Sequence, residues 1–469
     1  MTYDLSILIP ARNEMFLSKT IDDILKNKRG RTEILVGLDG EWSDPGIEDH
    51  PDVRILYYPE SIGQRAMTNQ LCKLSSAKYV MKVDAHCAFD EGFDVKLMAD
   101  MRDDWTMVPT MRNLHVFDWI CPEGHRRYQS PSGLCIDCGE RTQMEIVWIP
   151  KKNPQSNSYC FDAEPHFQYF GEFTSRAEGQ GEITPTMSLQ GSCFIITRDK
   201  YWELNVCDEQ FGSWGSQGIE VACKTWLSGG QVMVNRKTWY AHLFRTQGGD
   251  FGFPYDNSES GKQQAKKMVR DLFFNNKWDK AKHPLSWLVE KFWPIKNGDK
   301  TYWAEEDLKN LKEQESIYIQ TKNDQKNLTK GIIFFTDNQL TLKIARKVQD
   351  QLCDISQEMN IPIVSTSLKP MSNMGKNIHI HLPRGKFAYY TQILTALENS
   401  DTDIIYLCEH DVIYSKTHFD FTPPRKDKFY YNQNFWKVRL SDGFSVHWDA
   451  NQVSGLCASR SLLLDYYRN

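Results

Sequence analysis

The sequence predicts an α/β protein with a parallel sheet in a first domain and a second, smaller α/β domain after it. Three observations predict this class. Short apolar runs rich in β-branched residues alternate with helical patterns. Polar motifs follow directly after these runs, and parallel sheets bind their ligands at the carboxyl ends of strands. The same alternation starts again near residue 331.

The first domain is expected to span residues 1–300. Its predicted strands are 5–9, 33–38, 54–58 and 79–83, and its predicted early helices are 16–26 and 63–74. From about residue 105 to 158 the pattern breaks into a Cys-, Pro- and Gly-rich insertion, and periodic structure resumes over 187–245. A basic, aromatic helical stretch follows at 261–293.

A helix and a polar linker are expected over 301–330, with the helix at 303–320 and the linker at 321–330. The second domain is expected over 331–469. Its predicted strands are 331–335, 361–365 and 403–408, and its predicted helices are 339–359 and 385–399. Each domain places acidic residues after an apolar strand, which is consistent with two domains of the same architecture.

The composition is that of an ordinary globular protein. Of 469 residues, 40% are hydrophobic and 25% are charged, which excludes a disordered chain or a fibre. Lys and Arg number 56 against 61 Asp and Glu, so no global basic field holds nucleic acid. No apolar run approaches a membrane span, and the N-terminus lacks a signal-peptide pattern. We therefore expect a cytoplasmic protein with no membrane partner, whose 12 cysteines are reduced thiols or metal ligands.

The motif VDAHC at 83–87 is a candidate metal site. Asp84 and His86 lie two residues apart after an apolar strand, so both side chains project in the same direction. One oxygen and one nitrogen ligand suit Mn²⁺ or a similar divalent ion, and such an ion neutralises a departing diphosphate. The alternative is a surface aspartate beside a structural histidine.

The residues around this motif resemble nucleotide-sugar glycosyltransferases with the GT-A (Rossmann-like) fold, particularly the large family two. The resembling segments are SILIPARNE at 6–14, VGLDG at 36–40 and GQRAMTN at 63–69. The Asp-x-His-Cys form of the metal motif is similar to that of the polypeptide N-acetylgalactosaminyltransferases. The segments QGSCFII at 190–196, DEQFGSWG at 208–215, WLSGG at 226–230 and AHLFR at 241–245 follow in that family's order.

This resemblance, over roughly residues 5–245, implies roles for individual residues. His242 would be the third metal ligand beside Asp84 and His86, and Trp214 would border the sugar. Asp39 and Arg65 would contact the nucleoside. The full set of implied donor-binding residues is Pro10, Arg12, Glu14, Asp39, Arg65 and Gly191. A loop at 248–252 would close over the donor as a lid.

One departure from the family concerns the general base. The family carries a carboxylate shortly after the Trp-Gly pair, where this sequence has Gln217, and an amide cannot take a proton. Either Glu220 or Asp208 replaces it, or the reaction needs no protein base. The second case fits a retaining mechanism in which the leaving phosphate accepts the acceptor's proton, and we favour it.

A second metal site is predicted in the insertion, at about residues 115–145. Cys121, His125, Cys135 and Cys138 form a C-x₃-H…C-x₂-C set with the count and tight turns of a tetrahedral Zn²⁺ site. Four ligands leave no open position, so the zinc would be structural and would hold an insertion that shapes the acceptor side. The alternative is a chance cluster of thiols.

In the second domain, Glu409 and Asp411 follow the apolar strand 403–408 with His410 between them. They are a candidate second metal site, and the domain is then a second GT-A-like unit, active or decayed. The alternative is an acceptor-binding or structural module whose acidic turn caps a helix.

The predicted function is that of a metal-dependent glycosyltransferase. It would use Mn²⁺ or Mg²⁺ to move a sugar from a uridine diphosphate sugar to a hydroxyl acceptor, with Zn²⁺ as a structural ion. The alternative from another class is a non-catalytic protein that binds nucleic acid or carbohydrate on a decayed transferase fold.

The acceptor hypothesis is 5-hydroxymethylpyrimidine in DNA, and the alternatives are a glycan or a protein. The domain combination resembles proteins of tailed bacteriophages, which implies the cytoplasm of an infected host. Residues 262–283 hold seven Lys and Arg against two Asp, with Phe273, Phe274 and Trp278 between them. Such a surface tracks phosphates and stacks on an everted base. The alternative is an amphipathic helix with core aromatics and solvated lysines.

Overall fold

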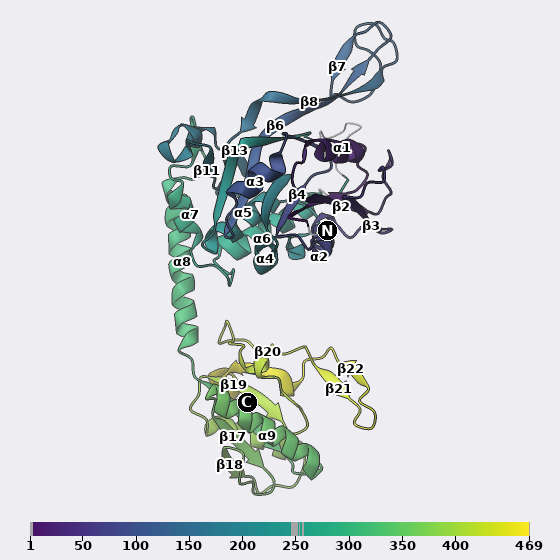
Figure 1. Cartoon of the computed structure of the whole chain (residues 1–469). Coiled ribbons are helices and arrows are strands. Elements are labelled where there is room, and N and C mark those ends of the chain that lie inside the picture. The colour runs from purple at the N-terminus through teal and green to yellow at the C-terminus, as the bar shows by residue number, and fades with distance from the viewer. Residues whose placement is uncertain (1–2, 245–251, 253, 256–257, 469) are drawn as a thin grey trace. The chain divides into compact units, whose positions relative to one another are not determined.

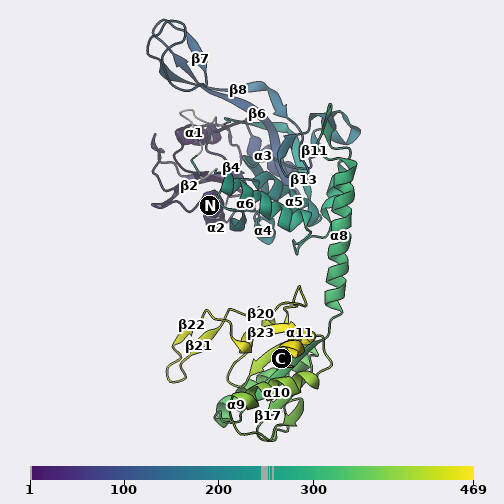
Figure 2. The ribbon, with the colours of Figure 1, turned by 180° about the vertical axis from the view of Figure 1, so that it is seen from behind.

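The computed structural model describes residues 3–244, 252, 254–255 and 258–468. The chain forms two compact units, Met1–Tyr318 and Ile319–Asn469. Figures 1 and 2 show the elements of each unit from opposite sides.

The first unit is built on a mixed sheet with strand order β11-β13-β6-β12-β4-β1-β2-β3. The strands are β1 (Leu5–Ala11), β2 (Thr32–Asp39), β3 (Val53–Tyr58), β4 (Tyr79–Val83), β6 (Trp105–Ile120), β11 (Ile183–Pro185), β12 (Cys193–Thr197) and β13 (Gln231–His242). The helices beside them are α1 (Leu17–Asn27), α2 (Gln64–Leu74), α3 (Phe93–Asp100), α4 (Arg198–Glu203) and α5 (Gln217–Leu227). The α/β prediction is confirmed, but the sheet is not wholly parallel, because β12 runs antiparallel to β4 and β6.

The central strands explain why the sequence folds this way. Every residue of β1 and β2 is buried, as in a sheet that helices cover on both faces. The helix α1 presents Leu17, Ile21 and Ile24 to this core, together with the buried Thr20, and leaves Lys19, Asp22 and Lys26 exposed. Strands β1, β4 and β13 end at the same edge of the sheet, because β4 pairs parallel with β1 and β13 pairs parallel with β6.

The insertion forms a long β arm that leaves the body of the first unit (Figures 1 and 2). The second half of β6 pairs antiparallel with β8 (Gln143–Ser156), and its end also pairs with β7 (Arg126–Tyr128). A short strand, β5 (Cys87–Phe89), pairs with the end of β13 near the base of the arm. The Cys-rich segment therefore caps a hairpin.

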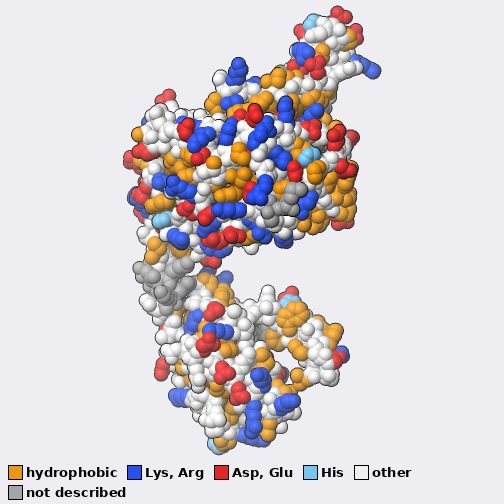
Figure 3. All heavy atoms as spheres, viewed as in Figure 1, with side chains coloured by type: hydrophobic (Ala, Val, Ile, Leu, Met, Phe, Trp, Pro, Cys, Tyr) orange, Lys and Arg blue, Asp and Glu red, His pale blue; other side chains and the backbone are white. Residues whose placement is uncertain are grey.

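The basic stretch after β13 contains α6 (Glu259–Val269), η4 (Arg270–Phe274) and α7 (Leu285–Lys291). Phe273, Phe274 and Trp278 are buried, and Phe274 stacks on Trp303 with ring centroids 5.6 Å apart. The prediction that these aromatic residues form a stacking surface is therefore wrong, since they belong to the core. Figure 3 shows basic, acidic and hydrophobic side chains interspersed on the visible face of this unit.

The last helix of this region, α8 (Glu305–Lys326), continues into the expected linker and crosses the boundary between the units. The segment 321–326 was predicted as part of a linker because it is wholly polar, but it continues the helix; Lys322, Gln325 and Lys326 favour a helix, and no Gly or Pro interrupts it. In the described part of the chain, no helix has the length and apolar character needed to cross a membrane.

The second unit has a six-stranded sheet with order β18-β17-β16-β19-β23-β20. Its strands are β16 (Lys330–Thr336), β17 (Ile363–Ser367), β18 (Lys376–His379), β19 (Ile404–Glu409), β20 (Tyr430–Tyr431) and β23 (Leu456–Ser459). Its helices are α9 (Leu342–Met359), α10 (Lys386–Glu398) and α11 (Arg460–Arg468). The first four strands in this order are parallel, and β23 is antiparallel to β19.

Successive side chains of β16 point to opposite faces of this second sheet, so the strand contributes to two cores, one on each face. Ile332 and Phe334 pack with α9 on one face, and Ile333 and Phe335 pack with α10 and α11 on the other. A hairpin of β21 (Trp436–Val438) and β22 (Ser445–His447) lies outside both cores. The unit has helices on both faces of a mostly parallel sheet, and its likeness to a GT-A domain stays a prediction.

The remaining short elements connect these parts. They are β9 (Tyr159–Phe161), β10 (Phe167–Tyr169), η1 (Gly171–Ser175), η2 (Ala177–Gly179), η3 (Glu209–Phe211), β14 (Lys296–Asn297), β15 (Lys300–Thr301), η5 (Lys416–Phe419) and η6 (Val453–Gly455).

Candidate active site

A pocket of about 590 Å³ lies at the edge of the first sheet where β1, β4 and β13 end. Pro10 and Glu14 line it from β1 and the turn after it, Asp84 and His86 from the segment after β4, and His242 from the end of β13. The pocket is thus where the sequence predicted a site, because the carboxyl ends of these strands meet there.

Three of the predicted metal ligands come together in a group that could hold a metal ion. One ligand atom from each of Asp84, His86 and His242 lies within 4.8 Å of the others. The pairing of β5 with β13 places Cys87 opposite His242, which brings a distant histidine beside the Asp-x-His motif. His242 Nε2 lies 3.2 Å from Asp84 Oδ2.

These side chains fit a divalent cation of the Mn²⁺ type. They offer one oxygen and two nitrogens, and both histidines are almost fully buried. Burial, opposed by the hydrogen bond with Asp84, lowers the pKa of His242 to about 4, so its imidazole is neutral at pH 7 as a ligand must be. Its Nδ1 is buried and has no hydrogen-bond partner among the described residues.

Lys82 is a site residue that the sequence analysis missed. Its side chain is 1% exposed, pairs with Asp84 Oδ1, and donates a hydrogen bond to the carbonyl oxygen of Gly191 at 2.8 Å. Burial opposes ionisation of Asp84, but the Lys82 ammonium and the hydrogen bond from His242 lower its pKa below the usual range. The available signal was a lysine inside the apolar strand YVMKV at 79–83.

Glu14 was predicted to bind the donor, and the structure places it against a metal-site histidine. Its Oε2 lies 3.2 Å from Nδ1 of His86, and both side chains are buried. A carboxylate in this position orients a ligating imidazole and selects its tautomer. Glu14 therefore reaches the cation site through His86.

Asp39 and Arg12 do not line the pocket among its described residues. The Asp39 carboxylate is fully buried and accepts hydrogen bonds from Ser61 Oγ and from the backbone N–H groups of Ile62 and Gly63. Arg12 donates to the carbonyl oxygens of Asp39 and Pro254. The prediction of direct nucleoside contact by Asp39 is not met, because both of its oxygens hold the 61–63 loop.

Arg65 and Glu220 were predicted to contact the nucleoside and to act as a base, and the structure contradicts both roles. Their side chains are 1% and 0% exposed and form an ion pair at 3.1 Å. Glu220 also pairs with Lys224 at 2.8 Å, and Arg65 donates to the carbonyl oxygens of Gly212 and Gly215. This buried network holds the turn before α5 and does not reach the pocket.

Asp208, the other carboxylate considered as a base, is also occupied. It caps the turn η3 by accepting a hydrogen bond from the N–H of Gln210, and it does not line the pocket. Gln217 does line the pocket, and its Nε2 donates to Cys207 Sγ at 3.3 Å. Among the described lining residues, the carboxylates are therefore only Glu14 and Asp84.

Trp214, which was predicted to border the sugar, and Gly191, which was predicted to bind the donor, both line the pocket. A Cβ on Gly191 would lie 3.2 Å from Oε1 of Gln217, so the close approach of these two segments favours glycine. The wall formed by residues 165–167 and α6 adds side chains that the sequence analysis did not assign: His166, Lys262 and Lys266. The predicted lid, 248–252, lies outside the described residues except for Gly252.

The four predicted zinc ligands also come together, at the tip of the arm. Cys121 Sγ and Cys135 Sγ lie 3.5 and 3.6 Å from His125 Nδ1, and Cys138 Sγ lies 3.6 Å from Cys121 Sγ. A tetrahedral zinc with bonds of about 2.0–2.3 Å separates its ligand atoms by about 3.5–3.8 Å. The spacing therefore fits zinc, and all four cysteine and histidine side chains form one group.

Glu409 and Asp411 do not form a comparable group. Within the described residues, neither belongs to a set of three close metal-ligating side chains. Burial, followed by the charge of Asp411, raises the pKa of Glu409. The second metal site predicted here is not supported, because a lone pair of neighbouring carboxylates lacks a third ligand.

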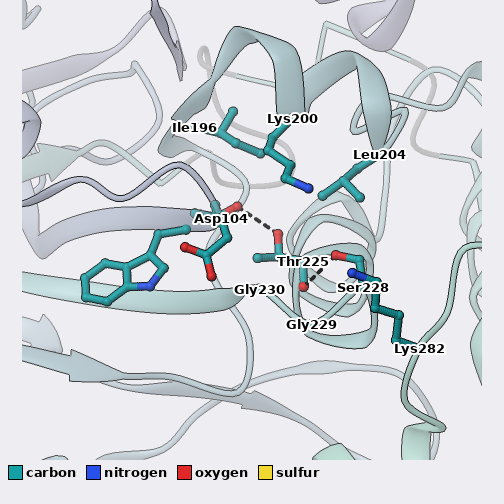
Figure 4. Close-up of a pocket in the computed structure, with 11 residues that line it drawn as sticks. Asp104, Ile196, Lys200, Leu204, Thr225, Ser228, Gly229, Gly230 and Lys282 are labelled. Atoms are coloured by element: carbon teal, nitrogen blue, oxygen red, sulfur yellow. Dashed lines mark hydrogen bonds between the residues drawn. The ribbon is translucent and has the colours of Figure 1, made fainter.

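A smaller pocket of about 160 Å³ lies at the other edge of the first sheet, where β6 and β13 begin (Figure 4). The side chains of Lys200 and Lys282 border it, and Ser228 Oγ donates to the carbonyl oxygen of Thr225 at 3.0 Å. None of the predicted site residues lines this pocket, and it is at the amino ends of the strands.

The sequence comparisons agree on one class of enzyme, the glycosyltransferases. Residues 6–120 match the model of the family described as Glycosyl transferase family 2, a segment that runs from β1 to the end of β6. Putative polypeptide N-acetylgalactosaminyltransferase 9 of Drosophila melanogaster is 25% identical over 163 residues, which are 35% of this chain and 22% of that protein. Polypeptide N-acetylgalactosaminyltransferase 3 of Homo sapiens is 22% identical over 219 residues, or 45% of this chain and 31% of that protein.

Two solved structures show more distant similarity. The crystal structure of GalNAc-T7 with UDP, GalNAc and Mn²⁺ gives a TM-score of 0.42 at 14% identity, covering 67% of this chain and 55% of that one. Staphylococcus aureus TarS 1–349 in complex with UDP-GlcNAc gives 0.38 at 10% identity, covering 63% and 72%. The matched regions of this chain span less than a third of the two curated relatives described above.

Proposed function

We propose that this chain, with its glycosyltransferase family 2 region at residues 6–120, transfers a sugar from a uridine diphosphate sugar to a hydroxyl acceptor. The observation that carries the proposal is the group formed by Asp84, His86 and His242 in the largest pocket described above. A carboxylate and two imidazoles in a pocket of about 590 Å³ suit a nucleotide sugar held through a divalent cation.

Each residue around the cation site then has a role in holding the donor. When bound, Mn²⁺ or Mg²⁺ supplies the positive charge that neutralises the leaving diphosphate. Asp84 and the two histidines hold that ion, and Glu14 orients His86. The buried ammonium of Lys82 adds a second positive charge beside the diphosphate position. Trp214 borders the sugar. Arg12, Asp39 and Arg65 do not line the pocket themselves, and they hold neighbouring segments in place through hydrogen bonds.

The pocket supports a retaining reaction. Gln217 cannot accept a proton, Glu14 and Asp84 serve the cation site, and Glu220 is sealed in an ion-pair network. The leaving phosphate then takes the proton of the acceptor hydroxyl. The alternative is inversion with His166 as base. Its Nδ1 lies 3.1 Å from a carboxylate oxygen of Asp162, and its Nε2 lies 2.8 Å from Nζ of Lys266, so Lys266 would have to move away before this nitrogen takes a proton.

The donor assay tests the proposal. With Mn²⁺ and a panel of UDP-glucose, UDP-galactose, UDP-GlcNAc and UDP-GalNAc, we expect one donor to raise the melting temperature and to be hydrolysed slowly to UDP. EDTA should stop both effects reversibly, and the anomeric configuration of transferred sugar distinguishes retention from inversion. Stabilisation without turnover would favour the non-catalytic alternative, and no effect of any donor would contradict the proposal.

The acceptor site is proposed to favour a negatively charged molecule. Lys262 and Lys266 line the pocket, and Lys267 and Arg270 continue along the same stretch of helix towards a second hollow beside α6. DNA that carries 5-hydroxymethylpyrimidines has this charge, but the aromatic residues expected to stack on its bases are in the core. A phosphate-bearing glycan or an acidic protein segment would use the same lysines.

We also propose that the arm holds a structural zinc ion. The tip has almost no core of its own: Leu134 and Ile136 are 60% and 81% exposed, so little apolar burial stabilises it. The backbone N–H of Asp137 donates a hydrogen bond to the Cys135 sulfur, which stabilises the thiolate form that zinc requires at this position. Metal binding would then supply the folding energy of the tip.

For this site we expect one zinc per chain in freshly purified protein and almost none in Cys135→Ser. Trypsin should cut the variant rapidly at Arg126, Arg127 or Arg141, because the tip unfolds when the fourth ligand is lost. Elemental analysis and timed proteolysis measure the two effects. Cys353→Ser, a half-buried cysteine of the second unit, should change neither. Zinc-free wild-type protein with a protease-resistant arm would contradict the assignment.

A further inference from the structure

The second unit repeats the strand order of the first unit. Both sheets place the third, second, first and fourth strands of their unit side by side, as β3-β2-β1-β4 and as β18-β17-β16-β19. In both, an antiparallel strand, β12 or β23, pairs with the fourth strand, and β6 or β20 lies beyond it. The helices correspond too, because α1 and α9 follow the first strand, α2 and α10 the third, and α4 and α11 the antiparallel strand. The two units therefore share one topology.

The pairing register of the fourth strands also agrees. Tyr79, the first residue of β4, pairs with Thr197 at the end of β12. Ile404, the first residue of β19, pairs in the same way with Ser459 at the end of β23. The hydroxyls of Thr197 and Ser459 each accept the backbone N–H three residues further on, both at 3.3 Å. Positions along β4 and β19 can therefore be compared one by one.

This comparison places Glu409 and Asp411 at the positions of the first cation site. Five positions after the paired first residue comes Asp84 in the first unit and Glu409 in the second. Seven positions after it come His86 and Asp411. The motif at 409–411 is thus the counterpart of the metal motif, with two carboxylates in place of a carboxylate and an imidazole.

The ends of the first strands give independent support for this correspondence. Leu5 of β1 and Lys330 of β16 pair with the first residues of the fourth strands. Eight positions further on come Asn13 and Asn338, whose φ angles are 47° and 56°. A residue other than glycine seldom adopts this left-handed backbone. The chain therefore leaves both first strands through the same uncommon conformation.

The two carboxylates of the second unit have no counter-ion in the described part of the protein. In the first unit Asp84 pairs with Lys82, but Leu407 has the position of Lys82 in β19. Neither Glu409 nor Asp411 forms an ion pair with a described residue, although Glu409 is half-buried. Neighbouring carboxylates without a positive partner favour a bound cation, and oxygen ligands suit Mg²⁺ and Mn²⁺.

Phosphate oxygens would complete the coordination of such a cation. The third ligand of the first site, His242, comes from β13, and the described strands of the second sheet include no counterpart of β13. Mg²⁺ is commonly held by one or two carboxylates together with the phosphates of a nucleotide, and not by a closed set of protein ligands. Glu409 and Asp411 do not make a metal site by themselves, but they are sufficient for a cation that arrives with a diphosphate.

Positive groups lie at the same edge of the second sheet. Arg384 follows β18, and its Nε lies 2.7 Å from Oδ2 of Asp337, which follows β16. His410 follows β19, and its Nδ1 lies 2.8 Å from Oγ1 of Thr336 and 3.8 Å from Oδ1 of Asp337. The groups after β16, β18 and β19 therefore meet beside the point where the strand order reverses. Open α/β sheets bind nucleotides at such points.

We propose that the second unit binds a nucleoside diphosphate, free or as part of a nucleotide sugar, together with Mg²⁺ or Mn²⁺ held by Glu409 and Asp411. His410 lies beside the diphosphate, and Arg384, 74% exposed, turns from Asp337 to its oxygens. The chain then carries two nucleotide sites of one topology. This inference rests on the proposed donor site of the first unit, because that site supplies the positions compared.

The test counts the nucleotides that the full chain binds. Equilibrium dialysis with and without Mn²⁺ uses UDP, GDP and ADP in turn, and UDP-glucose and UDP-GlcNAc distinguish a nucleotide sugar from the free nucleotide. We expect two Mn²⁺-dependent sites in the wild type and one in His242→Ala, in which the first cation site lacks a ligand. Adding Glu409→Gln or Asp411→Asn to His242→Ala should weaken the remaining site by about tenfold or more, because a charged ligand of the cation is lost.

Asp354→Asn is the matched control, because it changes an exposed carboxylate of α9 and should leave the remaining site as it is. Asp411 is exposed, so its variant should fold, and thermal unfolding checks this. The proposal is overturned if His242→Ala binds no nucleotide, or if its remaining site is unchanged by both Glu409→Gln and Asp411→Asn. One site in the wild type that is lost in His242→Ala overturns it and leaves the transferase proposal intact. One site that survives His242→Ala and is lost with Asp411→Asn supports it and contradicts the cation site of the first pocket.

Discussion

His242→Ala should lower the rate of sugar transfer by about a thousandfold or more and leave the fold of the first unit intact. The variant removes one of three cation ligands, and the lost contribution is charge stabilisation of the departing diphosphate. Because the imidazole is neutral, no buried charge is left without its partner. Steady-state kinetics over a range of Mn²⁺ concentrations, with thermal unfolding as the test of folding, measures both parts of this expectation.

The same experiment needs a histidine outside the pocket as its control. His115→Ala removes a half-buried imidazole of the arm that pairs with Asp118, and it should retain nearly full activity. Asp84→Asn should match the loss in His242→Ala, but it also removes the carboxylate charge that faces Lys82, so some destabilisation is expected there. Wild-type rates in His242→Ala would remove the assignment of the cation site.

Glu220→Gln should lower the free energy of unfolding by about 3–5 kcal/mol, the typical cost of removing one partner from a buried ion pair. The change leaves Arg65 and Lys224, each 1% exposed, without the carboxylate that lies between them. The amide has nearly the same shape as the carboxylate. The loss of stability therefore reflects the missing charge and hydrogen bonds, and not a change in packing. Urea denaturation of the variant and the wild type measures the difference.

Glu203→Gln is the matched control, because its carboxylate pairs with Lys200 on the surface and is 56% exposed. Pairs of this kind contribute about 0–1 kcal/mol, so this variant should unfold almost like the wild type. The comparison also tests the role predicted from the sequence. A Glu220→Gln protein that is fully stable and yet inactive would restore Glu220 as the general base.

Local patterns were sufficient for the elements of the fold. The strands predicted at 5–9, 33–38, 54–58 and 79–83 correspond to β1–β4. For β1, β2 and β4 the reason is a continuous apolar run, which has few alternatives in a covered sheet, whereas β3 is a partly exposed edge strand. The positions after these strands were also predictable, since parallel strands end at one edge. What periodicity could not show was the direction of β12, because pairing direction depends on partners far away in the chain.

The sequence by itself determined which residues can act as ligands. Asp84 with His86, and the Cys-His set of the arm, are close in the chain, so their spacing alone indicated chemistry that the structure brings together. The tertiary structure alone decided which of the other polar residues face a pocket. Lys82, to which the sequence analysis gave no role, lies beside Asp84, while Glu220 and Arg65 were expected in the site and are buried in the core.

The contact between Glu14 and His86 is a further case that only the tertiary structure decided, since the two residues are 72 positions apart in the chain. The physical reason is the same throughout. Chain spacing determines which groups are neighbours along a strand or turn, but burial and the choice of hydrogen-bond partner are set by segments that are distant in sequence and meet only when the sheet has formed.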